Sequence, residues 1–137
     1  MDYTTIDQAI EVLNDSTQNY HEREGAVRFL GGHPSQQAID HLVRALQDDN
    51  FGVRWEAAVS LTHLGEAALP ELLTALTDPH RVGDPRLREG AYHILHYTQD
   101  PPLPVPVGDL MNAMKGPAAG VATIEEAGRL LELLRKQ

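Results

Sequence analysis

The residues that could do chemistry are, first, one acid and two histidines close together in the chain. Glu89, His93 and His96 are spaced i, i+4 and i+7, so in a helix they share one stripe. Carboxylate and imidazole groups can ligate a divalent metal ion, and His63 could approach them. Three groups along one helix seldom converge on a single ion, and a solvated helix face is the favoured interpretation. The sequence therefore predicts no cofactor, with these three residues as the alternative metal site.

Other kinds of reactive site have no signature in the sequence. The chain has no cysteine, which excludes disulfides, Cys-ligated zinc, iron-sulfur clusters and thiol catalysis. It contains no G-x-S-x-G motif, no phosphate-binding glycine loop and no paired catalytic carboxylates. The net charge of −9 argues against nucleic acid as a partner. No residue is predicted to be catalytic.

The elements that position these residues are repeated helix pairs. An apolar quartet with the i, i+3, i+4, i+7 spacing of a helix face occurs four times, at Ile6, Ala9, Ile10, Leu13; Ile39, Leu42, Val43, Leu46; Leu69, Leu72, Leu73, Leu76; and Val107, Leu110, Met111, Met114. Between the quartets a second helical pattern places small or apolar residues at Ala26, Val27, Leu30; Ala57, Ala58, Leu61; Ala91, Tyr92, Leu95; and Ala127, Gly128, Leu131. No segment alternates with the period of a strand, so the fold is predicted to be all-α.

Charged residues recur in register with these patterns. The first three copies place an arginine three residues before the alanine of the second pattern and an aspartate two residues after the quartet, at Arg23, Arg54, Arg88 and Asp15, Asp48, Asp78. The fourth copy has Gly116 and Ile124 at these positions. We predict a single domain, residues 1–137, with four repeats at about 4–33, 35–65, 66–98 and 106–136.

Helix ends and the path between the last repeats also have sequence signals. Thr5 with Gln8 and Thr123 with Glu126 have the spacing of capping boxes at the start of a helix, and Ser35 can cap the third helix. Four prolines in residues 101–106 cannot lie inside a helix, so they predict an extended strap before the last pair.

The segment from Ala38 to Leu64 resembles a HEAT repeat of the short bilin-lyase type, the PBS lyase HEAT-like subclass. That pattern is a leucine-rich helix, an aspartate and then V-R-x-x-A-A-x-x-L, here Asp48, Val53, Arg54, Ala57, Ala58 and Leu61. The resemblance covers nearly the whole chain and weakens toward both ends. It implies a right-handed α-α superhelix, a HEAT-like solenoid of about four helix pairs with second helices on the concave face.

The resemblance also implies a structural ladder along the repeats. Asp15, Asp48 and Asp78 would cap the second helices, and Arg23, Arg54 and Arg88 would reach them or a neighbouring turn by charge-assisted hydrogen bonds. These six residues are therefore assigned to structure and not to catalysis.

Similar repeats also build enzymes, among them bilin lyases and deoxyhypusine hydroxylase. The hydroxylase repeats a His-Glu pair just after the ladder arginine, whereas this chain has Glu24-Gly25, Trp55-Glu56 and Glu89-Gly90 there. Bilin lyases are longer and usually need a partner subunit. We predict a non-enzymatic scaffold that binds a protein. The alternative is an enzyme or enzyme subunit that modifies a tetrapyrrole or a partner protein, metal-assisted through His93 and His96.

The predicted partner surface lies on the second helices, opposite the alanine and leucine stripe. Its positions are Glu24, Arg28 and Gly31; Trp55, Val59 and Thr62; Glu89, His93 and His96; and Glu125, Arg129 and Glu132. Tryptophan and arginine supply many of the strongest contacts in interfaces. We predict that the partner contacts Trp55, Val59, His93, His96, Arg28 and Glu89, and the alternative is that Trp55 packs within its own helix pair.

Localisation and assembly are predicted from apolar segments. The longest uncharged stretch, residues 29–39, is too short and too rich in glycine and proline to span a bilayer, and the start of the chain lacks a signal peptide. We expect a cytoplasmic protein with a protein partner, no nucleic acid and no membrane. Leu130, Leu131, Leu133 and Leu134 exceed one buried stripe, so the last repeat is expected to meet the strap, a partner or a second copy in a homodimer.

Overall fold

The computed structural model describes residues 5–98 and 102–137, so position 4 of the first predicted repeat and Pro101 of the strap lie outside the described residues. The chain divides into two compact units, residues 1–64 and 65–137. Every regular element in the described residues is a helix, which confirms the all-α prediction. The prediction of a single domain stays a prediction.

None of the helices in the described residues is long and apolar enough to cross a membrane.

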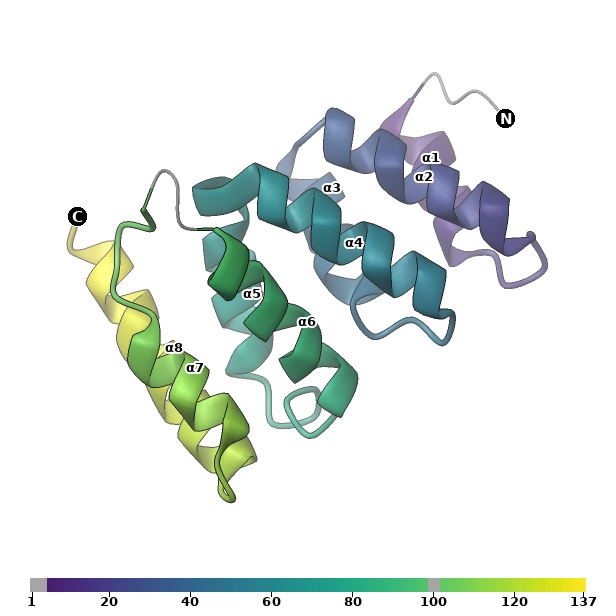
Figure 1. Ribbon diagram of the computed structural model, residues 1–137. Helices are drawn as coiled ribbons and strands as arrows, with labels where there is room; N and C mark the ends of the chain where they lie inside the picture. Colours follow the sequence, from purple (N-terminus) through teal and green to yellow (C-terminus); the bar gives the residue numbers. More distant parts are fainter. Residues whose placement is uncertain (1–4, 99–101) are drawn as a thin grey trace. The chain divides into compact units, whose positions relative to one another are not determined.

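Unit 1 contains two helix pairs in two layers (Figure 1). The pairs are α1 (Ile6–Asn14) with α2 (Tyr20–Gly32) and α3 (Gln36–Ala45) with α4 (Phe51–Leu64). The second helices, α2 and α4, pack against each other extensively, and α1 contacts α3 in the other layer. The predicted apolar faces meet between the layers, where Leu13, Leu30, Leu42 and Leu61 are buried. Each pair thus covers an apolar stripe of the other pair, which neither pair could bury alone.

Unit 2 also contains two helix pairs, but the last pair is arranged differently. A short 3₁₀ helix, η1 (Gly65–Ala68), leads into α5 (Leu69–Leu76), followed by α6 (Pro85–Tyr97), α7 (Gly108–Lys115) and α8 (Ala119–Arg135). The second helix of the last pair, α8, packs on the first helix of the preceding pair, α5, while α7 contacts α6. The long connection through the proline strap lets α7 follow the layer of α6.

This arrangement corrects one prediction about the last repeat. Glu125, Arg129 and Glu132 were expected to continue the layer of second helices that includes α6. They lie on α8, whose main neighbours are α5 and α7. The sequence pattern of a repeat identifies its two helices. It does not show which helix of the preceding pair each of them packs against, because that depends on the path of the connection between the pairs.

Side chains fix the starts of the helices, with one exception to the prediction. The Thr5 hydroxyl accepts from the Gln8 N–H at 3.1 Å and the Ser35 hydroxyl from the Ala38 N–H at 3.0 Å, as predicted. Thr123 is wrong as a cap. It lies in the second turn of α8, fully buried, and its hydroxyl has no hydrogen-bond partner among the described residues.

The repeated aspartates form turns and do not cap the second helices. Their carboxylates accept from the backbone N–H two residues later, Asp15 from Thr17 at 2.9 Å, Asp48 from Asn50 at 2.9 Å and Asp78 from His80 at 2.8 Å. The predicted capping role belongs to Asn19, Asn50 and Asp84, whose side chains accept from the N–H groups of Glu22, Val53 and Arg86. An aspartate beside a turn bonds the nearest N–H before it can reach the helix.

The repeated arginines all bond to the segment that precedes their helix, in line with the predicted alternative of a neighbouring turn. Each donates to a backbone carbonyl of the preceding segment, Arg23 to Leu13 at 2.9 Å, Arg54 to Asp48 at 2.8 Å and Arg88 to Val82 at 2.7 Å. Arg23 in addition pairs both guanidinium Nη atoms with the Asp48 carboxylate of the next repeat. The ladder therefore exists between the first two repeats, and its common element is the arginine-to-carbonyl bond.

The C-terminus of unit 2 meets the strap. The Gln137 side chain donates to the Pro104 carbonyl at 2.8 Å, and Val105 is buried. On α8, Leu130 is fully buried, and Leu131, Leu133 and Leu134 are half-buried. The homodimer through the C-terminal repeat stays a prediction.

Candidate functional site

The exposed large apolar side chains of the described residues all lie on the second helices. In unit 1 they are Tyr20, the first residue of α2, and Phe51 and Trp55 on α4, with Phe51 70% and Trp55 49% exposed. Phe51 and Trp55 are one helical turn apart and therefore lie on the same side of α4. The predicted hot spot Trp55 thus has an aromatic neighbour on the same helix.

Close packing of α2 against α4 fixes this aromatic surface. A side chain at Gly31 would overlap the Ser60 hydroxyl and Cβ, and one at Gly52 would overlap the Glu24 carboxylate. The two helices can approach this closely because both glycines lack a Cβ. The aromatic residues therefore project from two helices that are held in fixed register.

Two charged residues of the predicted surface, Arg28 and Glu24, have different roles in the structure. Arg28 is exposed and forms a 3.0 Å ion pair from α2 to Glu56 on α4, beside Trp55 in the sequence. The Glu24 side chain is only 18% exposed, because it packs against Gly52, so Glu24 is part of the helix contact and not of an exposed rim.

Tyr20 and Phe51 are functional candidates that sequence reasoning missed. Both stand three residues before a ladder arginine, so they occupy the same repeat position, and this equivalence was the available signal. The Arg54 guanidinium carbon lies 5.6 Å from the centre of the Phe51 ring, and the His21 ring lies 4.2 Å from that of Tyr20. Aromatic rings flanked by cationic and acidic groups can bind a protein through apolar contact and hydrogen bonds.

In unit 2 the predicted histidines form part of an aromatic cluster on α6. The Tyr97 ring lies 4.6 Å from the ring of His93 and 4.7 Å from that of His96, and the Tyr92 ring is 6.1 Å from that of His96. Burial lowers the pKa of His93 below its ordinary value, and the positive charge of His96 lowers it further. Tyr97 is largely exposed, so this cluster is a second aromatic surface.

The structure does not assemble the alternative metal site. Within residues 5–98 and 102–137, no group of three or more histidine, aspartate or glutamate side chains could hold a metal ion. The imidazoles of His93 and His96 instead lie 4.6 Å and 4.7 Å from the Tyr97 ring.

The predicted partner surface is divided between the two units. Arg28, Trp55 and Val59 belong to unit 1, where Val59 is half-buried. Glu89, His93 and His96 belong to unit 2, where Glu89 and His96 are exposed and His93 is half-buried. The three residues of each unit are therefore described together, and the two groups are treated as separate surfaces.

Comparison with known proteins assigns the chain to a family. Residues 6–96 match the family model described as HEAT repeats. Comparisons with curated proteins and with solved structures gave no match. The matched region covers most of the chain and includes the first three helix pairs, which confirms the predicted class of an α-solenoid made of HEAT-like pairs. The chain belongs to the HEAT-repeat family.

Proposed function

We propose that this protein is a non-enzymatic scaffold that binds a protein partner through the exposed faces of its second helices. HEAT repeats are commonly scaffolds for protein interactions, and the ladder residues Arg23 and Asp48 are used in packing. The proposal includes membership of the short bilin-lyase-type subclass, supported by the buried Val53, Ala57, Ala58 and Leu61 of the second repeat.

The observation that carries the proposal is the location of exposed aromatic surface. Phe51 and Trp55 keep large exposed fractions on α4, whereas the first helices α1 and α3 expose no large apolar side chain in the described part of unit 1. Aromatic side chains bury large areas when a partner covers them and dominate binding energies. We name Tyr20, Phe51, Trp55 and Arg28 the unit 1 face and assign the partner contact to it, with Trp55 at its centre.

The experiment compares the proteins captured from native cell extract by wild type, Trp55→Ala, Phe51→Ala and Val121→Ala. Val121 is the matched control, since it is 66% exposed on α8 of unit 2 and is not one of the residues of the unit 1 face. A partner of this face is captured by wild type and Val121→Ala and lost with the other two variants. After purification, its binding to Trp55→Ala should be weaker by about 1–3 kcal/mol.

Two results would contradict the proposal. A partner that binds all variants equally would place the contact outside the unit 1 face. A purified protein that is coloured or carries stoichiometric metal would favour the enzyme alternative.

A further inference from the structure

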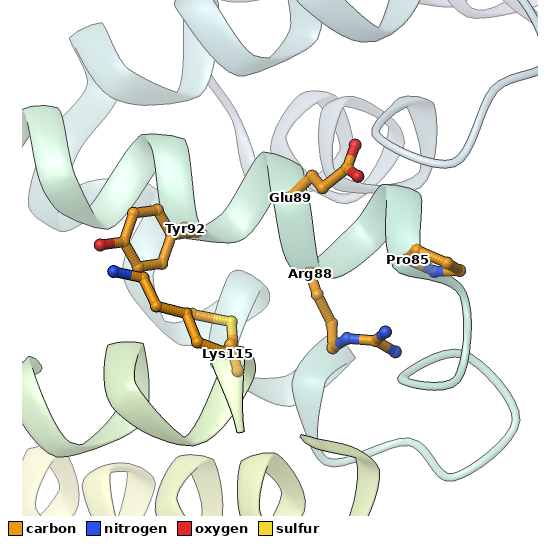
Figure 2. Close-up of a pocket in the computed structure, with 6 residues that line it drawn as sticks. Pro85, Arg88, Glu89, Tyr92 and Lys115 are labelled. Carbon is orange, nitrogen blue, oxygen red and sulfur yellow. The ribbon is translucent and has the colours of Figure 1, made fainter. Parts of the chain in front are cut away.

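A groove in unit 2 lies between the start of α6 and the end of α7 (Figure 2). Its volume is about 370 Å³, and it is lined by Pro85, Arg88, Glu89, Tyr92, Met114 and Lys115. The two helices that border it differ in length, thirteen residues in α6 and eight in α7. At 1.5 Å per residue, α7 extends over about 12 Å of the roughly 20 Å of α6. The first turns of α6 therefore border the groove.

The lining combines apolar side chains with two cations, Arg88 and Lys115, and one acid, Glu89. Met114 is buried, and the half-buried Tyr92 ring and Pro85 add apolar surface. The Lys115 ammonium lies 4.4 Å from the centre of the Tyr92 ring. Arg88 donates from one Nη atom to the Val82 carbonyl.

The two cations of the groove differ from those arginines of this acidic chain that pair with a carboxylate. Arg23 and Arg28 pair with the carboxylates of Asp48 and Glu56. Within the part of the chain that the structure describes, neither Arg88 nor Lys115 forms an ion pair with a carboxylate. Figure 2 shows the Glu89 carboxylate pointing away from the Arg88 guanidinium. The groove therefore offers positive charge beside apolar surface, which complements an anionic ligand with an apolar part.

We infer that the groove binds an acidic peptide segment of a protein partner. Two acidic side chains of the segment contact Arg88 and Lys115 separately, because Figure 2 shows these cations at different ends of the groove, and an apolar side chain between them packs on Met114 and Tyr92. A small molecule binds best where a cavity surrounds most of its surface, whereas this groove is open along one side. A peptide compensates by making contacts with several successive side chains. This surface is separate from the unit 1 face and does not depend on it.

The test uses a blocked nine-residue peptide in which Glu and Asp alternate with Leu and Phe, titrated into protein labelled with ¹³C at the methionine methyl groups. Met114 lines the groove, and the half-buried Met111 on the same helix is the internal reference. The Met114 signal shifts on titration, and that of Met111 shifts much less. Lys115→Gln weakens binding about threefold to tenfold, and Lys115→Arg restores it.

A matched variant separates this site from a general charge effect. Lys136→Gln makes the same charge change at an exposed position beyond α8 and leaves binding unchanged. Arg88→Gln weakens binding like Lys115→Gln, with helix content checked by circular dichroism because Arg88 also bonds Val82. Trp55→Ala binds the peptide normally, so this test succeeds or fails independently of the unit 1 face.

Three results would overturn the inference. The first is an equal loss of affinity in Lys136→Gln and Lys115→Gln. The second is a Met114 signal that does not move, or equal binding of a control peptide with Gln and Asn in place of the acids. The third is equally strong binding of free glutamate, which would rule out the peptide as the ligand.

Discussion

Unit 1 and unit 2 are built from the same kind of helix pair but use their charges and glycines differently. In unit 1, Arg23 and Arg28 form ion pairs that connect one repeat to the next. The short ion pairs of unit 2 join residues two or three positions apart, as in Arg86 with Asp84, Arg129 with Glu126 and Arg135 with Glu132. A longer contact of 3.8 Å, between Arg129 and Asp109, joins α8 to α7.

The glycines show the same difference between the units. Gly31 and Gly52 of unit 1 lie where a Cβ would overlap a side chain of another helix. In unit 2, Gly120 and Gly128 of α8 have nothing within 4 Å of a Cβ position. Unit 1 thus uses close contact and inter-repeat ion pairs to fix two aromatic-bearing helices, while unit 2 leaves a groove and cations without acidic partners. The regular contact between α2 and α4 holds the aromatic surface of unit 1 in place, whereas the different arrangement of the last pair in unit 2 accompanies the groove between α6 and α7.

The largest effect is expected from removing the ion pair that joins the first two repeats. Arg23 and Asp48 are each only 15% exposed, and Arg23→Ala leaves the Asp48 carboxylate and the Leu13 carbonyl without this donor. We expect the free energy of unfolding to fall by about 2–4 kcal/mol. The measurement is urea unfolding followed by the fluorescence of Trp55, the single tryptophan, which reports on unit 1.

The unit 2 counterpart is Arg129→Ala. Its ion pair with Glu126 is more exposed and lies within one helix, so the expected loss is at most about 0.5 kcal/mol by circular dichroism. Equal losses for Arg23→Ala and Arg129→Ala would remove the distinction between the units.

Two glycine substitutions should have opposite signs. Gly31→Ala places a Cβ 2.6 Å from the Ser60 Oγ and 2.9 Å from its Cβ, and the second contact cannot be relieved by rotating the hydroxyl. We expect a loss of about 1–3 kcal/mol despite the better helix propensity of alanine. Gly128→Ala meets no atom within 4 Å inside α8 and should stabilise by about 0.5–1 kcal/mol.

Gly32→Ala is the matched control in unit 1. It follows Gly31 directly, at the last residue of α2, and nothing lies within 4 Å of its Cβ position. Urea midpoints of the three variants measure the effects. If Gly31→Ala is as stable as Gly32→Ala, the close contact of α2 with α4 does not contribute to the difference between the units.

The sequence predicted the repeating parts of the fold and missed what depends on their three-dimensional neighbours. Apolar spacing was enough to place the helix pairs, because burial requires one apolar face per helix. The capping box at Thr123 was wrong because α8 begins one turn earlier, at Ala119, where two alanines among residues 119–122 favour helix. The reversed layers of α7 and α8 depend on the path of the strap, which has no periodic signal.

The candidate sites were predicted to a smaller extent. Trp55 was identified because it is the only tryptophan, and its 49% exposure agrees with a surface position. The groove was not predicted, because it depends on how the start of α6 and the end of α7 lie beside each other and on which cations there lack acidic partners. Such a hollow has no sequence pattern, since its lining comes from two helices that are joined by the strap.

The smallest expected effect concerns pH and distinguishes the aromatic cluster of unit 2. Burial, followed by the charge of His96, lowers the pKa of His93 below its ordinary value of 6.5. Between the lowered pKa and 6.5 the unfolded chain binds more protons at this residue than the folded protein, so stability falls as the pH falls through this range. Urea unfolding by circular dichroism at several pH values between 5 and 7.5 should show a decline that is smaller in His93→Gln. His80→Gln, which removes another histidine of unit 2, is the control. An identical pH dependence in wild type and His93→Gln would show that packing against Tyr97 does not disfavour the charged imidazole.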